Sequence, residues 1–390
     1  MQKKRKLRIL TVSISYPPYT SGVAVVAFSL TKAMKERGHS VGIITSSHTK
    51  KYYVREVGGI KEYRLESIEN PFRENYFVPT VQIRMGKIFR EFEPDIIHLH
   101  DISPTALSLL NIAKNKVPVL YTHHFIPRFI GRHFIGEGES YIRKLITKGI
   151  EGTLTKYITN FANKCDYITT PTKTIKNHLR EYGVTTAIRP ISNGIDSSKF
   201  VPKDFNKKEN LPILLYFGRI DRDKSLEVLV KAAVHIKVPF RLILAGSGQE
   251  TPKLKSLAEK LGVGEKIEFL GFIEEAKKSE LFRKASVFVI PSTVEAQSIV
   301  TMEALSTGLP VVAANASALP ELVHDGVNGL LFKPENSRDM ASKISRLLSS
   351  EKLQKEFGDN SLGLIKKHDI RKTFDAYEKL YFELSERYPL

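Results

Sequence analysis

Short apolar runs alternate with longer amphipathic stretches along most of the chain. The apolar runs predict strands at 7–14, 41–45, 96–99, 117–122, 167–170, 213–217, 241–245, 267–269, 287–290 and 311–313. These runs are continuously apolar rather than alternating, which is typical of parallel strands covered on both faces. The stretches between them have helical spacing, and repeated strand–helix units predict an α/β fold. We therefore expect two Rossmann-like, doubly wound sheets, one in each half of the chain.

A polar segment at 197–212 separates the two halves, and it contains Pro202 and Pro212 and carries Lys203, Lys207 and Lys208. Such a composition predicts a domain boundary. The last predicted helix carries Phe374, Tyr377 and Tyr381 on one face. We expect this helix to return to the first domain, so the predicted domains are 1–197 with about 373–390, and 198–372.

The composition is that of a two-domain globular protein. The chain has 390 residues, of which 42% are hydrophobic and 26% charged. Its one cysteine, Cys165, excludes a disulfide framework and a multi-cysteine metal site. No apolar run reaches the about 18 residues that span a bilayer. The apolar stretch after the basic start is short and favours a buried strand over an export signal, which predicts a cytoplasmic protein.

The positive charge is concentrated in the first half of the chain. The net charge is +18, and residues 1–200 hold 31 Lys and Arg against 16 Asp and Glu, whereas residues 201–390 hold 29 against 26. A lysine-rich solubilising surface is one explanation, but it would not favour one half. The asymmetry indicates a polyanionic partner: nucleic acid, an anionic membrane surface or a phosphorylated ligand.

The segment 125–164 interleaves aromatic and basic residues at helical spacing. This pattern fits a helix lying on anionic lipid, a nucleic-acid surface, or a core helix with a solvated basic face. All three interpretations stay open. For the lipid interpretation, the candidate membrane or acceptor contacts are Arg128, Arg132, Arg143, Lys144 and Lys148.

Candidate ligand residues follow the predicted strands, where doubly wound sheets place their sites. Gly22 stands at a helix N-terminus, which can bind an anion. Arg219 and Lys224 follow the strand at 213–217 and Gly218, and the two cations could hold one phosphate group. Gly246 begins a second glycine turn, which by itself is weak evidence of a ligand.

The segment 291–303 is the most informative stretch. Glu295 is predicted in the loop after a buried strand, and Glu303 lies eight positions on, within an apolar helix. Residues eight apart on a helix share a face, so the two carboxylates should flank one ligand, and sugar hydroxyls suit them. The backbone N–H groups of Gln297, Ser298 and Ile299 at the helix start suit a phosphate.

Histidines follow two consecutive strands of the first half, in the segments 98–101 and 122–125. They could contact a substrate, bind a metal, or be buried structural residues. The pair Asp221 and Asp223 looks like a metal site, but two cations adjoin it. We predict helix capping for these aspartates and no metal.

These motifs together resemble the donor site of the retaining glycosyltransferases of family 4. Arg219 with Lys224, and Glu295 with Glu303, match its two paired motifs, and the segments 191–196, 271–273, 303–312 and 320–332 are similar as well. The resemblance covers essentially the whole chain. It implies a GT-B fold, with two Rossmann-like domains facing a cleft and a C-terminal helix crossing back, and a metal-independent transfer from a nucleotide sugar without any cofactor.

The resemblance also implies roles for single residues. Arg219 and Lys224 would hold the diphosphate. Glu303 would bind the ribose and Glu295 the donor sugar. Further positions with implied roles are His124 at the donor sugar, Gly22 at the diphosphate, and Ile273 at the base through its backbone.

Two positions depart from the common family pattern. Ser225 stands where the family often has glycine, and the segment 295–298 replaces Glu-x-Phe-Gly with Glu-Ala-Gln-Ser. The second form, with the basic 125–164 segment, is more similar to the diacylglycerol glucosyltransferases. The prediction is a hexosyltransferase that uses UDP-glucose and a lipid acceptor, lies on the inner face of the cell membrane and has no nucleic-acid partner. The sequence makes no prediction about its oligomeric state. Transfer from a UDP- or GDP-sugar to a soluble sugar or polysaccharide, a nucleic-acid-binding protein, and a nucleotide-sugar sensor remain as alternatives.

Overall fold

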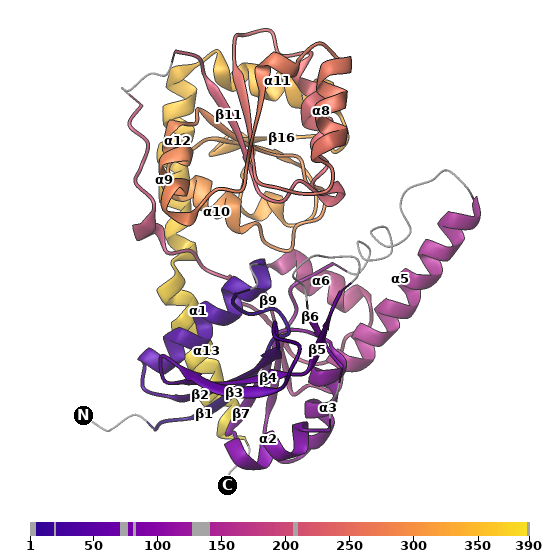
Figure 1. The fold of residues 1–390 in the computed structure, drawn as a ribbon. Helices are drawn as coiled ribbons and strands as arrows, with labels where there is room; N and C mark the ends of the chain where they lie inside the picture. The colour runs from indigo at the N-terminus through magenta and orange to yellow at the C-terminus, as the bar shows by residue number, and fades with distance from the viewer. Residues whose placement is uncertain are drawn as a thin grey trace. The chain divides into compact units, whose positions relative to one another are not determined.

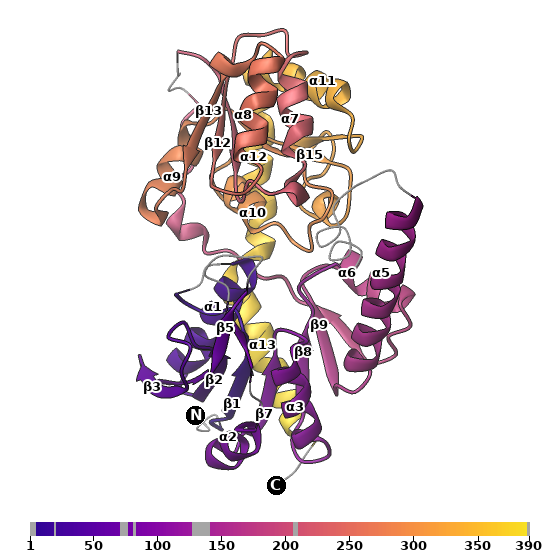
Figure 2. The ribbon, with the colours of Figure 1, turned by 45° about the vertical axis from the view of Figure 1, so that its right-hand side comes forward.

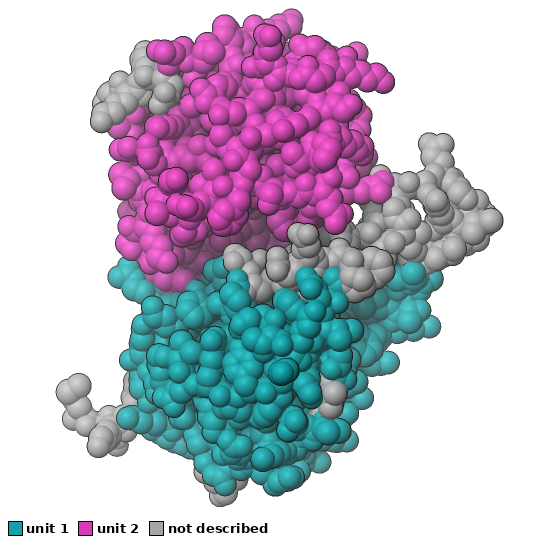
Figure 3. All heavy atoms as spheres, viewed as in Figure 1, with its two compact units in different colours: residues 1–127, 148–193, 371–390 teal, residues 128–147, 194–370 magenta. Residues whose placement is uncertain are grey.

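The computed structural model describes residues 5–18, 21–70, 77–80, 83–126, 141–205 and 210–387. The chain forms two compact units, coloured separately in Figure 3. Unit 1 comprises Met1–Pro127, Lys148–Asn193 and Arg371–Leu390, and unit 2 comprises Arg128–Thr147 and Gly194–Ile370. A sheet lies at the centre of each unit (Figure 1).

The sheet of unit 1 has eight strands in the order β10-β9-β8-β7-β1-β2-β4-β3. Every neighbouring pair is parallel except β3 with β4, which is antiparallel at the edge. The strands are β1 (Arg8–Val12), β2 (Ser40–Ser46), β3 (Tyr53–Val57), β4 (Ile60–Leu65), β7 (Ile96–Leu99), β8 (Val119–Thr122), β9 (Tyr167–Thr170) and β10 (Ile188–Pro190). A separate antiparallel pair is formed by β5 (Ser67–Glu69) and β6 (Phe77–Pro79).

Helices cover both faces of this sheet (Figure 2). One face packs on α1 (Gly22–Glu36) and α13 (Ile370–Ser385) through an apolar cluster that includes Leu30, Tyr377 and Tyr381. The other face packs on α2 (Met85–Phe92), α3 (Pro104–Ala113), α5 (Tyr141–Ala162) and α6 (Lys173–Glu181). The predicted return of the C-terminal helix to the first sheet is confirmed, and its buried aromatic face explains why.

The sheet of unit 2 is fully parallel, with six strands in the order β13-β12-β11-β14-β15-β16. They are β11 (Ile213–Phe217), β12 (Arg241–Ala245), β13 (Ile267–Gly271), β14 (Val287–Ile290), β15 (Val311–Ala314) and β16 (Gly329–Phe332). The helices of the unit are α7 (Leu226–Ala233), α8 (Thr251–Lys260), α9 (Glu275–Lys284), α10 (Ile299–Ser306), α11 (Ser337–Leu348) and α12 (Glu351–Ile365). A single apolar core joins sheet and helices.

The predicted fold class is confirmed, because both sheets are doubly wound and are parallel apart from the edge strand β3. Most predicted strands agree with the structure within two residues at each end. The strands β3, β4, β10 and β16 and the β5–β6 pair were not predicted. β3, β10 and β16 are short edge strands, and β4 interrupts its apolar residues with Lys61, Glu62 and Arg64, so the apolar pattern is hidden.

Within the described residues, no helix has the length and apolarity needed to cross a membrane. The predicted acceptor contacts Arg128 and Arg132 lie outside the described residues. Arg143, Lys144 and Lys148 belong to α5, but their side chains are likewise outside what the structure describes.

Candidate functional site

The strand order of unit 2 reverses between β11 and β14. From β11 the chain proceeds to β12 and β13 on one side, and then returns to β14, β15 and β16 on the other. Ligands of doubly wound sheets bind at such a switch point, beyond the carboxyl ends of the strands. Arg219 and Lys224 follow β11, and Glu295 follows β14, so the fold brings all three to one place.

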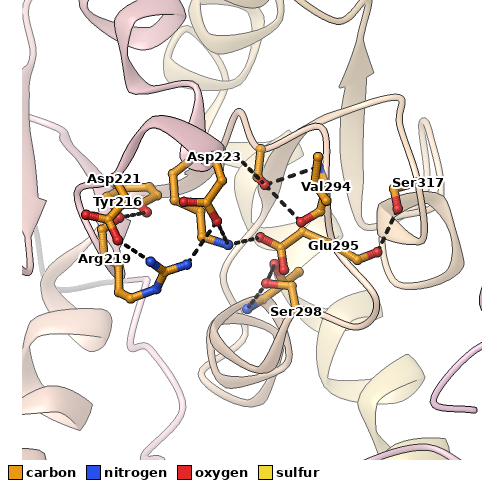
Figure 4. A network of polar contacts seen from close by, with 11 residues as sticks. Tyr216, Arg219, Asp221, Asp223, Val294, Glu295, Ser298 and Ser317 are labelled. Carbon is orange, nitrogen blue, oxygen red and sulfur yellow. Dashed lines mark hydrogen bonds and ion pairs between the residues drawn. The ribbon is translucent and has the colours of Figure 1, made fainter. Parts of the chain in front are cut away.

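Figure 4 shows the ionic network that these residues form. The Arg219 guanidinium pairs with Asp221 and, at 3.0 Å, with Oδ2 of Asp223. The Lys224 ammonium lies 3.3 Å from the same Asp223 oxygen and 2.8 Å from Oε1 of Glu295. Both cations therefore converge on Asp223, and Glu295 joins through Lys224.

The aspartates of this network do not have the helix-capping role that the sequence predicted for them. Asp221 precedes a short 3-10 turn, Arg222–Lys224, but its side chain makes no capping hydrogen bond there. Asp221 accepts instead from the backbone N–H of Gln249, at 3.3 Å, and from Arg219. The capping prediction is wrong because the neighbouring guanidinium is a stronger partner for a carboxylate than a backbone amide.

The backbone around the network is tightly packed. A Cβ on Gly246 would lie 1.8 Å from the carbonyl oxygen of Gly218, so only glycine fits where the two loops meet. Ser225 has φ of +52°, a left-handed conformation that glycine adopts at lower cost. The departure from the family pattern at Ser225 thus leaves the backbone geometry in place.

The two cations differ in how far their side chains are buried. The Arg219 side chain is 45% exposed, whereas that of Lys224 is only 17% exposed. Burial acts to lower the pKa of Lys224, but Glu295 and Asp223 outweigh it, and the net change is a rise. Lys224 therefore stays charged, and the Oδ1 atom of Asp223 beside it is buried without a hydrogen-bond partner.

Glu295 is held by its backbone as well as by Lys224. Its carbonyl oxygen accepts from Ser317 Oγ at 2.8 Å and from the N–H of Ala318 at 3.2 Å. Three residues further on, Ser298 caps α10 by accepting from the N–H of Thr301 at 3.3 Å. Gln297 and Ser298 are both buried, and Ile299 is the first residue of the helix.

Glu303 pairs with a different cation. Because α10 begins only at Ile299, Glu295 lies outside the helix, and the argument from helical spacing does not apply to the two glutamates. Glu303 accepts from the Lys278 ammonium of α9 at 2.5 Å through Oε1, while its Oε2 is buried without a partner. Burial raises the pKa of Glu303 to about 7, and the Lys278 charge opposes that rise.

The loop after β13 carries the residue predicted to contact a base. Ile273 is half-buried and packs against the apolar core of the unit. Its neighbour Phe272 is 78% exposed, and Gly271 turns the chain with φ of +68°. The backbone of this loop is therefore reachable from solvent.

Unit 1 has its own switch point, between β1 and β7. Asp101, after β7, links the two strands at this point, because its Oδ2 accepts a hydrogen bond from the N–H of Ile14, after β1, at 2.8 Å. Gly22 opens α1 as predicted, and Ser21 caps that helix by accepting from the N–H of Ala24 at 3.1 Å.

The histidines lie at the same edge of this sheet. His98 is fully buried between the Tyr381 hydroxyl, at 2.7 Å, and Thr122 Oγ1, at 2.6 Å. For His98 the structural interpretation is therefore confirmed, since both ring nitrogens bind side chains of the unit. His100 Nδ1 lies 3.0 Å from His124 Nε2, and the two rings stack.

Burial lowers the pKa of His124 to about 4 and that of His100 below its usual range. Both rings are therefore neutral near pH 7 and can exchange hydrogen bonds without carrying charge. In the part of the chain that the structure describes, no group of three or more histidine, cysteine or carboxylate side chains is placed to hold a metal ion.

The sequence analysis missed Lys278, the partner of Glu303, and the role of Asp223 as the centre of the ionic network. Lys278 is one of several lysines on a polar helix, so nothing in its neighbourhood marked it. Asp223 carried a signal, because it stands four residues after Arg219, within reach of a salt bridge.

Two family models match this chain. The model described as Glycosyltransferase Family 4 matches residues 20–199, and the model described as Glycosyl transferases group 1 matches residues 197–362. Together they cover residues 20–362, which include the ionic network and Glu303.

The chain is also similar to individual proteins. It is 26% identical to alpha-monoglucosyldiacylglycerol synthase of Streptococcus pneumoniae, over 88% of this chain and 78% of the relative. Sucrose-phosphate synthase from Thermosynechococcus elongatus has a similar structure, with a TM-score of 0.79, 20% identity, and coverage of 96% of this chain and 98% of that one. Anabaena Alr3699/HepE in complex with UDP-glucose has a TM-score of 0.75 and 18% identity, with coverage of 96% and 99%. These likenesses establish a GT-B fold.

Proposed function

This chain belongs to glycosyltransferase family 4, and from that premise we propose that it transfers glucose from UDP-glucose to the hydroxyl of a membrane lipid such as diacylglycerol. It is a retaining glycosyltransferase that uses a nucleotide sugar. The sugar, the base and the acceptor are the proposed part. The observation that carries the proposal is the convergence of Arg219, Lys224 and Glu295 at the switch point of unit 2.

The proposed donor site assigns one role to each charge. Arg219 and Lys224 bind the diphosphate, and the diphosphate takes over contacts that they now make with carboxylates. Glu295 then accepts hydroxyls of the sugar, and the free Oε2 atom of Glu303 accepts those of the ribose. Gly218 and Gly246 let backbone and phosphate approach closely, and the backbone N–H groups of Gln297, Ser298 and Ile299 at the start of α10 bind phosphate oxygens. Gly22, at the start of α1, is the proposed anion site of unit 1. The backbone of Ile273 contacts the base.

The reaction breaks the bond between the sugar and the diphosphate, so negative charge develops on the leaving oxygen. Two fixed cations stabilise that charge, and one such preorganised group contributes about 3–4 kcal/mol in other enzymes. Asp223 keeps both cations oriented while no donor is bound. Attack from the face that the diphosphate leaves retains the anomeric configuration, and the departing phosphate oxygen accepts the proton of the acceptor. No metal or cofactor is part of this proposal.

His124 acts as an uncharged ring in this mechanism. Its pKa of about 4 excludes an imidazolium near pH 7. Because one ring nitrogen is engaged by His100, the other can form a hydrogen bond with a sugar hydroxyl. The stacked pair therefore orients the donor sugar without transferring a proton.

The lipid acceptor rests on two separate observations. The Streptococcus pneumoniae relative is named for a glucosyldiacylglycerol product, and residues 1–200 carry an excess of positive charge that suits an anionic bilayer. The proposal places the protein on the cytoplasmic face of the membrane. It also divides the chain into an acceptor domain, 1–197 with about 373–390, and a donor domain, 198–372.

The test combines donors and acceptors in one matrix. Purified protein is incubated with UDP-glucose, UDP-galactose or GDP-mannose and with anionic vesicles that contain or lack diacylglycerol. We expect UDP release and a glucosylated lipid only with UDP-glucose and diacylglycerol, with an α-linkage by NMR. Flotation with the same vesicles should fail at high salt. Transfer to a soluble sugar with no vesicle binding would replace the lipid by the soluble acceptor. Binding of RNA or DNA without any nucleotide-sugar turnover would overturn the proposal.

A further inference from the structure

Lys278 is buried on a helix whose other lysines are exposed. Its relative exposure is 9%, whereas the side chain of the neighbouring Lys277 is 73% exposed. The ammonium lies 4.9 Å from the ring centre of Phe217, at the end of β11. A lysine is rarely buried to this extent unless a partner compensates its charge.

That partner is Glu303, and Lys278 contacts only one of its two carboxylate oxygens. The ammonium lies 2.5 Å from Oε1, while Oε2 is buried without a hydrogen bond. The glutamate itself is 5% exposed. A buried oxygen with no partner is costly for the folded state, and a ligand hydroxyl that reaches it removes that cost.

We propose that Lys278 is the positioning residue that holds Glu303, charged and in one orientation, to receive the ribose hydroxyls of the donor nucleotide. The inference rests on the proposed function, in which Glu303 binds that ribose. Lys278 itself acts through Glu303. It occupies Oε1, so that Oε2 is the atom left for the nucleotide.

The charges around Glu303 make this role testable through pH. Burial raises the pKa of the carboxyl to about 7, Lys278 of α9 and Lys199 of a 3-10 turn lower it, and Glu275 of α9 raises it. Without Lys278 the balance moves further toward the protonated form. A neutral carboxyl is a weaker acceptor for hydroxyls than a carboxylate, so nucleotide affinity should depend on pH differently in the variant.

The experiment measures the affinity of full-length protein for UDP and 2′-deoxy-UDP between pH 6 and pH 9 by calorimetry. GDP and 2′-deoxy-GDP are run in parallel. Wild type should prefer the ribonucleotide by about tenfold at pH 8, as expected for one hydrogen bond to a charged group, and lose that preference as pH falls through 7. In Lys278→Met the same loss should occur at higher pH, so that the preference is nearly absent at pH 7.5 and returns at pH 9.

Three variants make the result specific. Lys277→Met changes an exposed lysine on the same helix and should behave as wild type. Glu303→Gln should lose the ribose preference at every pH, and adding Lys278→Met to it should change nothing more. Lys278→Arg keeps the charge and should keep the wild-type pH dependence, and it provides the comparison if the methionine variant unfolds.

The outcomes separate this inference from the proposed function. If wild type prefers UDP over 2′-deoxy-UDP and Lys278→Met shows the same preference at the same pH, Lys278 has no positioning role and the donor site stands. If wild type binds UDP without any ribose preference, this inference and the ribose role of Glu303 both fail, while the transfer of glucose from UDP-glucose stands. If wild type binds neither UDP nor GDP, both the proposed function and this inference are overturned.

Discussion

The two sheets of the protein have the same kind of switch point, but charged side chains lie at one and uncharged histidines at the other. In unit 2, residues beyond β11 and β14 form a charged network in which Arg219 and Lys224 share Asp223. In unit 1, residues at the ends of β7 and β8 and just beyond them form a neutral array in which His100 contacts His124 and His98 contacts Tyr381. Topology therefore selects the place of a site, and the side chains select what the place can bind.

Burial and neighbouring charges explain why the side chains of one region stay charged and those of the other stay neutral. Lys224 is held charged because two carboxylates outweigh the cost of desolvation. His124 has no carboxylate partner among its hydrogen bonds, so burial lowers its pKa to about 4 and keeps it neutral. A charged region suits a diphosphate, and a neutral array suits hydroxyl groups. Each of the following predictions tests this contrast.

The largest effect is expected for Lys224→Met. The substitution removes one of the two cations that stabilise the leaving diphosphate, and the rate of UDP release from UDP-glucose should fall by about 10²–10³-fold. Lys231→Met, which removes an exposed lysine paired with Glu227 on α7, is the control and should leave the rate unchanged. A Lys224→Met variant with nearly normal turnover would show that the charged region has no role in leaving-group stabilisation.

The neutral region should instead contribute stability. His98→Leu leaves the buried Tyr381 hydroxyl without its partner on β7, and the free energy of unfolding should fall by about 1–3 kcal/mol. Urea denaturation measures this difference. His235→Leu, at an exposed position after α7, is the matched control. Equal stability of the two variants would mean that the hydrogen bond between sheet and α13 contributes nothing.

A smaller effect is expected for Arg219→Lys. The guanidinium contacts two aspartates at once, and a single ammonium cannot reproduce both contacts. The affinity for UDP should fall by about tenfold, the value of one good hydrogen bond to a charged group. Calorimetric titration measures it, and Arg222→Lys, in the adjacent turn, serves as the comparison. An unchanged affinity would assign diphosphate binding to Lys224 alone.

The smallest effect concerns the pH dependence of His124→Gln. Because the pKa of His124 is about 4, its charge does not change between pH 6 and pH 8. Glu303, with a pKa of about 7, loses its charge as pH falls through that range, and UDP affinity should decrease with it. The pH midpoint of UDP binding should therefore be the same in His124→Gln and wild type. A shifted midpoint in this variant would mean that the histidine array carries charge after all.

The sequence was sufficient for the fold class and for part of the site. Buried parallel strands leave continuous apolar runs, and the residues that follow them in sequence also lie at the carboxyl edge of the sheet. That is why Arg219, Lys224 and Glu295 could be grouped from sequence alone. The strands β3, β4, β10 and β16 and the β5–β6 pair could not be predicted, because their apolar runs are short or interrupted by charged residues.

Pairings between distant segments required the tertiary structure. Lys278 and Glu303 are 25 positions apart, and His98 and Tyr381 are 283 apart. No local pattern distinguishes Lys278 from the exposed lysines beside it, since its contacts with Glu303 of α10 and Phe217 of β11 join distant segments. The sequence by itself determined where charge and apolar surface lie along the chain, because both are properties of single residues. The tertiary structure decided which charges meet, which oxygen atoms stay unpaired and which histidines lose their charge, because burial and contact arise only when distant segments pack together.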